Sequence, residues 1–377
     1  MNDFTSYNPV KIKFGAGVID ELGDVIGNRR VIVVTTQGTE RRGLMKRIRS
    51  GLGERLVGVY ANTPSNPTFE IVEDAFRALN KINCEVVVGL GGGSPLDLAK
   101  VVAAMKTSNN NEWLKKHLLL GDTTFPTPFT PPAIVTIPTT AGSGSEVSKW
   151  ASIWDMDEKM KYSISHPALY PEVALCDPEL GLTLSKRATT FTGLDALSHA
   201  VESIWNKNRN PLSITLAVGA IRTISSNLPL AYFSGDNIAI RAKMLTASLM
   251  AGLAMSNTQT ALAHCISYPL TAIYGLPHGM ACSLPLPWLV SLNEGEAVET
   301  IELLADGLGC AADTASVEKA FFAIFEAVGV NPYLSAYGVD NAGIEDIVDR
   351  IFKSDRLGNN LTQVDQSLMR SLLKRML

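Results

Sequence analysis

The sequence predicts an α/β domain with a parallel β-sheet over residues 1–180, followed by an all-helical domain over residues 181–377. Short runs of β-branched residues recur in the first half, and segments with a helical period of apolar residues separate them. After about Gly181 the strand-like runs stop. Strands that alternate with helices are typical of a parallel sheet covered by helices. At ~150 residues per domain, a chain of 377 residues has room for two to three domains.

Five buried strands are expected in the first half, each an almost continuous apolar run. They are residues 31–35, 56–60, 86–90, 133–137 and 173–175. Helical periodicity predicts helices over residues 69–81 and 96–105. Residues 125–132 contain four prolines and are expected to form a loop.

Long helices are expected throughout the second half, where apolar residues recur at helical spacing or fill whole segments. The clearest are residues 186–204, 213–225, 239–256 and 258–270. The most apolar stretch, residues 245–255, is followed at once by the polar residues 256–259. It is too short to span a bilayer, so we expect a buried core helix there.

Composition and charge indicate a small-molecule partner. The chain has 33 Lys and Arg against 37 Asp and Glu, a net charge of −4, which argues against nucleic acid or an anionic membrane as a partner. Five scattered cysteines without a CxxC pair argue against a disulfide framework and a cysteine zinc site. The N-terminus has no basic patch followed by an apolar stretch. We therefore expect a cytoplasmic protein.

A glycine-rich turn follows the strand at 86–90, where the sequence reads GGGSPLD. Ser94 is expected to cap the next helix, with Pro95 in its first turn and Asp97 completing a capping box. Glycines let backbone amides approach a phosphate at the N-terminus of a helix. A turn with only a structural purpose is the alternative, but three consecutive glycines favour phosphate binding.

A second polar loop follows the strand at 133–137, where the sequence reads PTTAGSGSE. The first loop departs from the G-x-G-x-x-G pattern, because Gly89 and Gly91 are followed by Ser94 at the last position. Serine, threonine and glycine are also common in ordinary loops. Two such loops after two strands nevertheless favour binding of one extended nucleotide.

One carboxylate and three histidines form a candidate metal site in the helical half. Asp195 and His199 are four residues apart on one predicted helix face, and His264 and His278 follow in later segments. Carboxylate oxygen and imidazole nitrogen suit Fe(II), Zn(II), Co(II) or Mn(II). Each residue alone is more often a core or surface group. The two histidines expected to be structural are His117 and His166.

The chain resembles the iron-containing (group III) alcohol dehydrogenases over nearly its whole length. The resemblance is carried by residues 91–97, 138–146, 192–199 and 277–279. It implies the fold shared with dehydroquinate synthase, NAD(P)H as cofactor, and a homodimer or higher homo-oligomer. It also implies a divalent metal, first Fe2+ with Zn2+ as the alternative, held by Asp195, His199, His264 and His278. The implied dinucleotide-binding residues are Asn66, Gly92, Gly93, Ser94, Asp97, Thr139, Thr140, Ser143 and Lys161.

Two positions depart from the family pattern. Members that use NAD often have an aspartate after the first strand, and here that position is Thr36. Loss of the carboxylate removes repulsion against a 2′-phosphate, and Arg41 or Arg42 would add positive charge, unless both belong to a solvated helix start. Many members also carry a histidine where this chain has Tyr268. The expected proton route is therefore Tyr268, a ribose hydroxyl or water.

Within the family, residues 154–155, 202–211 and 266–271 are similar to the phosphonoacetaldehyde reductase branch. The expected reaction is reversible reduction of a small aldehyde, and a phosphonate dianion would need cations in the pocket. The candidate cations are Lys149, Lys207 and Arg209. The alternatives are a general short-chain aldehyde reductase, a metal-dependent lyase of the dehydroquinate synthase type, and a nucleotide sensor without enzymatic activity.

Overall fold

A computed structural model describes residues 3–108, 112–120, 124–295, 298–354 and 356–377. Its internal contacts divide the chain into two units, which we call the sheet unit and the helical unit. The sheet unit comprises Asn8–Thr140 and Ser145–Gly181. The helical unit comprises Met1–Tyr7, Ala141–Gly144 and Leu182–Leu377.

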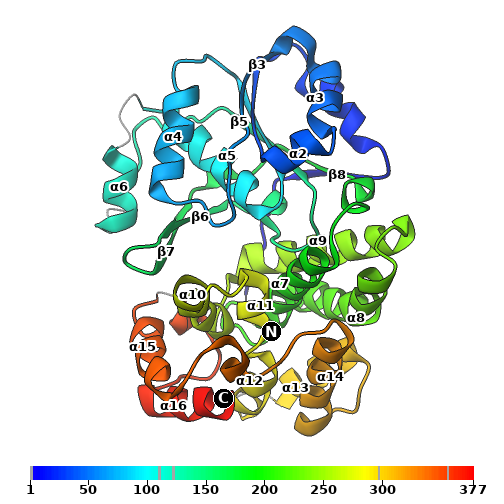
Figure 1. The fold of residues 1–377 in the computed structure, drawn as a ribbon, viewed down its shortest axis with the longest axis vertical. Coiled ribbons are helices and arrows are strands. Elements are labelled where there is room, and N and C mark those ends of the chain that lie inside the picture. Colours follow the sequence, from blue (N-terminus) through cyan, green and yellow to red (C-terminus); the bar gives the residue numbers. More distant parts are fainter. Residues whose placement is uncertain (1–2, 109–111, 121–123, 296–297, 355) are drawn as a thin grey trace. The chain divides into compact units, whose positions relative to one another are not determined.

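A parallel sheet of six strands forms the centre of the sheet unit (Figure 1). In spatial order its strands are β1 (Lys11–Phe14), β8 (Val173–Cys176), β5 (Ala133–Pro138), β4 (Val86–Gly91), β2 (Val31–Val34) and β3 (Leu56–Tyr60). All five expected strands are present, which confirms the predicted fold class. The edge strand β1 and a separate antiparallel pair, β6 (Trp150–Asp155) with β7 (Met160–Ser165), were not predicted.

Helices cover both faces of this sheet, which explains why its strands are apolar throughout. On one face Ile32 and Val34 of β2 pack in the same core as α4 (Phe69–Leu79), α5 (Gly93–Met105) and α6 (Glu112–Leu119). On the other face Val31 and Val33 pack in the same core as α1 (Leu22–Ile26) and α3 (Leu44–Leu52). The alternation follows from the two-residue period of a strand.

The start of α5 differs from the prediction. The helix begins at Gly93, and Gly92 occupies the N-cap position without a side-chain cap. The predicted capping box of Ser94 and Asp97 is therefore wrong. Both side chains serve tertiary contacts instead, because Ser94 Oγ accepts a hydrogen bond from Asn66 N at 3.2 Å and Asp97 accepts from Ser145 Oγ at 2.6 Å.

The helical unit contains no strand among its described residues, as predicted. Its α-helices are α7 (Lys186–Ile204), α8 (Pro211–Phe233), α9 (Ile238–Thr258), α10 (Leu262–Tyr274), α11 (His278–Ser283), α12 (Leu286–Glu294), α13 (Val298–Leu308), α14 (Thr314–Ala327), α15 (Asn341–Ile351) and α16 (Gln366–Arg375). The two helices predicted over 239–256 and 258–270 are present, but the second begins at Leu262 instead of residue 258, because Gln259 has a φ of 67° and separates α9 from α10. A left-handed residue cannot continue a right-handed helix.

Helix α9 is, within the described parts of the chain, the one helix whose length and composition would allow it to cross a membrane. Its most apolar window is 56% buried inside the fold. That burial fits the core helix that the sequence predicts.

Candidate active site

Three helices of the helical unit carry the candidate metal ligands. Asp195 and His199 lie on one face of α7, and Glu202 follows on the same face. His264 lies in the first turn of α10, and His278 is the first residue of α11 rather than part of a loop. These placements direct four potential ligands and one further carboxylate toward one another.

Close packing of α11 against α7 depends on Gly279. A Cβ added to Gly279 would lie 1.9 Å from the carbonyl oxygen of Phe191 and 2.8 Å from Asp195 Cβ. Only a residue without a side chain allows this approach. The glycine after His278 therefore helps to bring that histidine to the Asp195 carboxylate.

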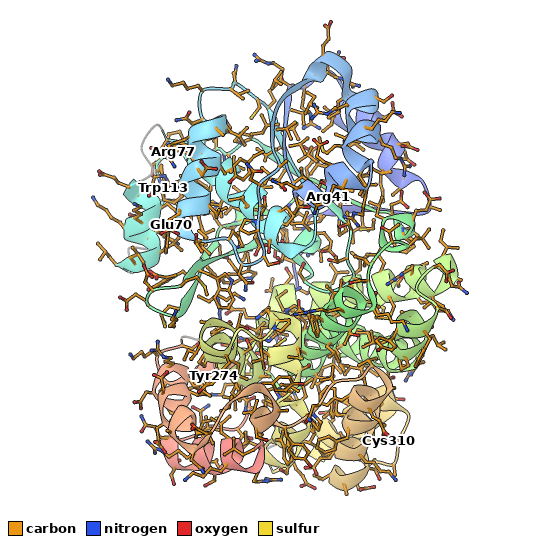
Figure 2. The ribbon with its side chains drawn as sticks, in the orientation of Figure 1. Arg41, Glu70, Arg77, Trp113, Tyr274 and Cys310 are labelled. Carbon is orange, nitrogen blue, oxygen red and sulfur yellow. The ribbon has the colours of Figure 1, made fainter. Side chains whose placement is uncertain are left out.

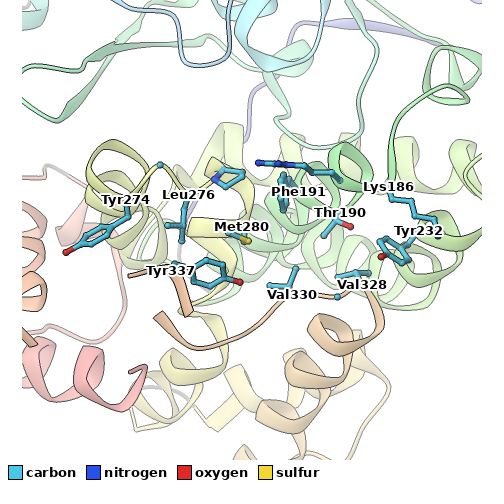
Figure 3. Close-up of a pocket in the computed structure, with 14 residues that line it drawn as sticks. Lys186, Thr190, Phe191, Tyr232, Tyr274, Leu276, Met280, Val328, Val330 and Tyr337 are labelled. Carbon is cyan, nitrogen blue, oxygen red and sulfur yellow. The ribbon is translucent and has the colours of Figure 1, made fainter. Parts of the chain in front are cut away.

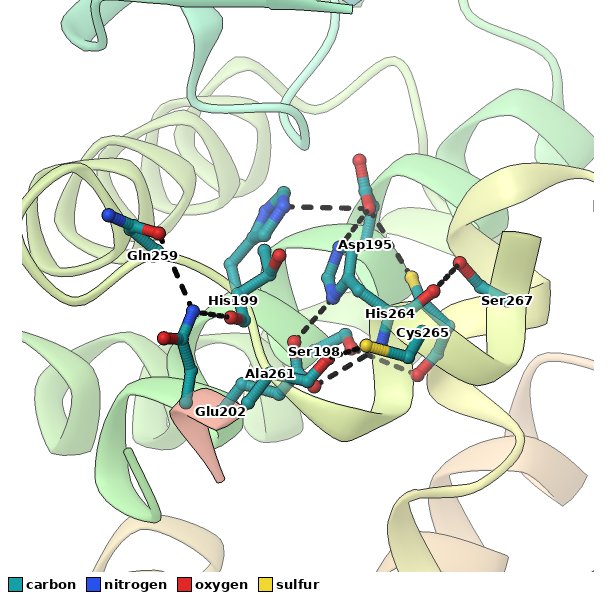
Figure 4. A network of polar contacts seen from close by, with 12 residues as sticks. Asp195, Ser198, His199, Glu202, Gln259, Ala261, His264, Cys265 and Ser267 are labelled. Atoms are coloured by element: carbon teal, nitrogen blue, oxygen red, sulfur yellow. Dashed lines mark hydrogen bonds and ion pairs between the residues drawn. The ribbon is translucent and has the colours of Figure 1, made fainter. Parts of the chain in front are cut away.

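The ligand atoms of Asp195, His264, His278 and Cys282 all lie within 4.8 Å of one another. Figure 4 shows Asp195 and His264 of this group. His199 lies beside this group, with Nε2 at 3.9 Å from Asp195 Oδ1 and its ring stacked on His264 at a centroid distance of 4.8 Å. Asp195 Oδ1 is also 3.9 Å from His264 Nε2. The structure thus brings together all four residues that the sequence singled out, and it adds a buried thiol.

His264 is oriented by a buried carboxylate. Glu202 has no exposed surface and accepts hydrogen bonds from the backbone N of His264 at 3.2 Å and from its Nδ1 at 2.5 Å. A carboxylate accepts, so Nδ1 carries the proton and Nε2 has the free lone pair. Among the described residues, Nε2 is buried without a hydrogen-bond partner. An orphaned imidazole nitrogen that faces a carboxylate fits a metal ligand.

The other two histidines are held in the same way. His199 Nδ1 lies 3.3 Å from the carbonyl oxygen of Gly142, which can only accept, so His199 also presents an unprotonated Nε2. His278 Nδ1 lies 3.5 Å from Ser267 Oγ, and that hydroxyl donates to the backbone oxygen of His264 at 2.7 Å. Anchored Nδ1 atoms that leave Nε2 for the ion are common in histidine metal sites.

The electrostatic balance also suits a cation. Burial alone would raise the pKa of Asp195, but the charges of His199, His278 and His264 outweigh it and lower that pKa. Burial, followed by the neighbouring Asp195 charge, raises the pKa of the Cys282 thiol well above its ordinary value. In this protein-only environment the carboxylate is ionised and the thiol is protonated. Carboxylate oxygen together with imidazole nitrogen is a donor set typical of Fe(II) or Zn(II).

Sequence reasoning missed Cys282 and the role of Glu202. Cys282 lies one turn after His278 and donates from Sγ to Asp195 Oδ1 at 3.4 Å. Its position four residues from a candidate ligand was the available signal. Glu202 is seven residues after Asp195, so the helical repeat already placed it on the ligand face.

The carboxyl ends of β4 and β5 carry the candidate phosphate-binding loops. Thr139 N donates to the carbonyl oxygen of Gly91 at 2.8 Å, which joins the two loops. Gly91 has a φ of 145°, and a Cβ there would lie 2.5 Å from Pro95 Cγ. A Cβ on Gly92 would lie 3.4 Å from Thr140 Oγ1, so these two residues face each other. The N-terminus of α5 therefore opens beside hydroxyls and backbone amides.

Asn66 belongs to the same group. Its φ of 54° is left-handed, and its backbone N donates to Ser94 Oγ at 3.2 Å. Lys161 lies on β7, where its ammonium is 5.8 Å from the ring of Trp154. Trp154 N in turn donates to the carbonyl oxygen of Pro67 at 2.9 Å, which ties the hairpin to the Asn66 loop.

Thr36 follows β2 and is the N-cap residue of α2 (Gln37–Arg41). The exposed Arg41 ends that helix (Figure 2), whereas Arg42 turns toward the loops, with Nη2 at 3.4 Å from Thr139 Oγ1. Burial lowers the pKa of Arg42. Ser143 belongs to the helical unit, whereas the other cofactor candidates belong to the sheet unit.

The three cations suggested for a phosphonate have different environments. Lys149 lies 5.8 Å from the ring of Trp150, and Lys207 is exposed. Arg209 donates from Nη1 to the carbonyl oxygen of Ile204 at 2.9 Å, so it satisfies the end of α7. Lys207 and Arg209 belong to the helical unit, and Lys149 belongs to the sheet unit.

Tyr268 lies beside the metal-ligand candidates. Its ring is nearly parallel to the ring of His278, with centroids 6.4 Å apart. Burial raises the pKa of Tyr268, while the Arg356 charge and a hydrogen bond from Thr260 oppose that shift. The phenol is therefore protonated at neutral pH.

The helical unit also has an open cavity of about 580 Å³ that the sequence did not predict (Figure 3). Its wall includes Phe191, one turn before Asp195, and Pro277, which directly precedes His278. Lys186 and Arg187 contribute positive charge, and three tyrosines contribute aromatic surface. The cavity and the ligand cluster thus share segments of α7 and α11.

Comparison with known proteins identifies the family. The iron-containing alcohol dehydrogenase model matches residues 9–178, and the model of the C-terminal part of Fe-containing alcohol dehydrogenases matches residues 189–377. A sulfoacetaldehyde reductase from Bilophila wadsworthia is 30% identical over 371 residues, which cover 95% of this chain and 94% of the relative. A 1,3-propanediol dehydrogenase from Citrobacter freundii is 30% identical over 361 residues, or 92% of both chains.

A solved structure extends the likeness to three dimensions. The sulfoacetaldehyde reductase from Bifidobacterium kashiwanohense in complex with NAD+ has a TM-score of 0.91 and 28% identity, and the match covers 100% of this chain and 99% of that one. Two family models together match nearly all of the sequence. The chain therefore belongs to the iron-containing alcohol dehydrogenase family.

Proposed function

We propose that this protein is a metal-dependent reductase that uses NAD(P)H to convert a small aldehyde to a primary alcohol. The carrying observation is the convergence of one carboxylate and three Nδ1-anchored histidines in a buried cluster. The reaction consumes one NAD(P)H and one proton for each aldehyde reduced. We further propose that the aldehyde carries an anionic head group, because the relatives named above include two sulfoacetaldehyde reductases.

The proposed ligands are Asp195, His199, His264 and His278, with Fe2+ as the first candidate and Zn2+ as the second. A divalent cation there would supply Lewis-acid polarisation of the aldehyde carbonyl. Glu202 holds the His264 ring and its tautomer, so Nε2 needs no reorganisation to bind. The orphaned Nε2 of His264 supports this assignment, because a buried donor or acceptor without a partner is costly.

Tyr268 is the proposed proton-handling residue. Its phenol is next to the His278 ring, and its raised pKa keeps the proton on the oxygen throughout the neutral range. The residue can therefore donate a hydrogen bond to a product oxygen but does not serve as a base at neutral pH.

The cofactor is proposed to bind along the glycine and threonine loops of the sheet unit. Gly92 and Thr140 face each other there, and Ser94 is already fixed by Asn66. We propose that NADPH is accepted at least comparably to NADH, since Thr36 carries no charge and the Arg42 guanidinium reaches Thr139.

A direct assay tests this function. Purified protein loaded with Fe(II), with Zn(II), or treated with a chelator would be mixed with NADH or NADPH and a series of aldehydes. We expect stoichiometric oxidation of the cofactor on addition of aldehyde, only in the metal-loaded samples. The proposal would be contradicted if no aldehyde caused oxidation of NADH or NADPH in any of the metal-loaded samples.

A further inference from the structure

We propose, building on the aldehyde reduction proposed above, that Arg356 binds the anionic head group of the substrate, a sulfonate or a phosphonate. Arg356 follows α15 in sequence and is half-buried. Its backbone N donates to Ser354 Oγ at 3.3 Å, and Cys265 Sγ donates to the same oxygen at 3.3 Å. Cys265 is the residue after His264, so the segment that carries Arg356 packs on the turn of α10 that bears a metal-ligand candidate.

Gln259 holds the guanidinium. Arg356 Nη1 donates to Gln259 Oε1, and Asn359 Nδ2 lies 3.5 Å from the same oxygen. Because the amide oxygen accepts from both residues, the Gln259 Nε2 group retains its role as a donor. Guanidinium and amide N–H groups side by side form the kind of donor array that binds tetrahedral oxyanions.

The backbone is strained at Gln259, directly after the end of α9. Gln259 is left-handed, with a φ of 67°, although glutamine rarely adopts that conformation. Its carbonyl oxygen accepts from Asn206 Nδ2 at 3.2 Å, and Asn359 Nδ2 donates to the carbonyl oxygen of Thr260 at 2.8 Å. Contacts from two segments, the one after α7 and the one that carries Arg356, therefore fix Gln259. Strain of this kind is concentrated at binding sites.

Gln259 and Arg356 are connected to the metal-ligand candidates through neighbouring residues. Thr260, next to Gln259, hydrogen-bonds the Tyr268 hydroxyl, and the Arg356 charge acts on the same hydroxyl. Tyr268 stacks on His278. A two-carbon aldehyde needs its head group only a few ångströms from its carbonyl, so the responsible cation must lie close to the histidines. Arg356 meets that requirement because Ser354, which accepts from its backbone N, also accepts from Cys265, the residue after His264, whereas Arg209 is bonded to the end of α7.

The test compares charged and neutral aldehydes in matched variants. Arg356→Gln removes the charge but keeps a hydrogen-bonding side chain, Arg356→Lys keeps the charge, and Lys353→Gln removes an exposed cation of the same segment as the control. For each protein, kcat/KM would be measured with sulfoacetaldehyde, phosphonoacetaldehyde and propanal. The thermal midpoint of each variant would confirm that it is folded.

We expect Arg356→Gln to lower kcat/KM for the anionic aldehydes at least about 100-fold and for propanal less than about 3-fold, since only the anion uses the cation. Arg356→Lys should recover part of the loss, and Lys353→Gln should match the wild type. A greater loss with sulfoacetaldehyde identifies the sulfonate as the natural head group, and a greater loss with phosphonoacetaldehyde identifies the phosphonate.

Equal losses for all three aldehydes, or no loss for either anion, would overturn the Arg356 assignment while leaving aldehyde reduction intact. Calorimetric binding of ethanesulfonate to the wild type and to Arg356→Gln provides a readout that needs no turnover. Weaker binding to the variant supports the assignment even in a protein that reduces none of the aldehydes, and equal binding contradicts it.

Discussion

The pair formed by Glu202 and His264 is the most informative contact at the scale of single residues. Both side chains are buried, and one carboxylate satisfies both the backbone N and the Nδ1 of the histidine. A carboxylate in this place costs desolvation energy, which a purely structural contact does not require. Its value lies in fixing the imidazole nitrogen that faces Asp195.

Glu202→Gln is therefore expected to weaken metal binding by about 10- to 100-fold, because an amide cannot accept two hydrogen bonds on separate oxygens. Metal content after a timed challenge with a chelator, together with kcat for aldehyde reduction, would measure the effect. Glu326→Gln, at an exposed position of α14, is the matched control. Full metal retention in Glu202→Gln would show that the carboxylate does not support the ligand.

Thr36 is the residue on which cofactor preference depends in our account. We expect the wild type to use NADPH at least as well as NADH, and Thr36→Asp to lower the kcat/KM ratio of NADPH to NADH at least about 10-fold through repulsion of the 2′-phosphate. Thr36→Ser should leave the ratio unchanged. A wild type that uses NADH but not NADPH would show that the lack of a carboxylate at position 36 does not determine cofactor preference.

At the scale of elements, helix α5 is tied to the second polar loop by a buried lysine. Lys100 has no exposed surface, and its ammonium donates to the carbonyl oxygens of Ser145 at 2.7 Å and Trp150 at 2.8 Å. Burial lowers the pKa of Lys100 to about 8 and raises the pKa of the nearby Glu146 to about 7. Among the described residues, Glu146 Oε1 is buried without a hydrogen-bond partner.

These shifts predict how stability depends on pH. The pKa of Glu146 in the folded protein lies above its ordinary value of 4.5. Its contribution to the free energy of unfolding is therefore complete below pH 4.5 and is lost as the pH rises through about 7. Lys100 is protonated in both states below about pH 8 and adds nothing in that window. The free energy of unfolding of the wild type should fall by on the order of 3 kcal/mol between about pH 5 and 7.5 because of Glu146, and this fall should be absent in Glu146→Gln.

Urea unfolding of the wild type and of Glu146→Gln at several pH values would measure this difference. Glu54→Gln, at an exposed carboxylate, should follow the wild type. If the difference between Glu146→Gln and the wild type does not grow with pH, then Glu146 is not the buried carboxyl that titrates near neutrality.

The elements differ in how far the sequence determines them. Strands β2 and β4 are continuous apolar runs, and such runs are recognisable because both faces are covered. Strand β1 is mostly exposed and carries two lysines, so its pairing with β8 has no apolar signal. The break between α9 and α10 was expected at residue 257 from the polar residues there, but its exact place was not, because tertiary contacts impose the left-handed conformation on Gln259.

The same limit applies to the site. Asp195 and the three histidines were found because their residue types suggest metal chemistry and because the chain has only five histidines. Cys282 and Arg356 were not found, since a single cysteine or arginine carries no pattern of its own. Their roles depend on contacts between segments far apart in sequence, such as the contact of Arg356 with Gln259.

At the scale of the whole molecule, the chemistry is distributed over segments distant in sequence. The helical unit includes Ala141–Gly144, the middle of the loop that follows β5. Gly142 in that segment provides the carbonyl oxygen for His199, and a Cβ there would lie 2.7 Å from Thr192 Cβ on α7. The loop whose threonines are assigned to the cofactor is thus continuous with a contact that orients a metal-ligand candidate.

The central claim is that the cluster around Asp195 binds a divalent metal on which aldehyde reduction depends. The most direct measurement is anaerobic titration of metal-free protein with Fe(II), following bound metal and NAD(P)H oxidation in the same samples. We predict that activity rises with bound metal and levels off at about one ion per chain. His264→Ala should bind far less metal and show no recovery. Full activity in the metal-free wild type, or recovery in His264→Ala equal to that of the wild type, would contradict the account.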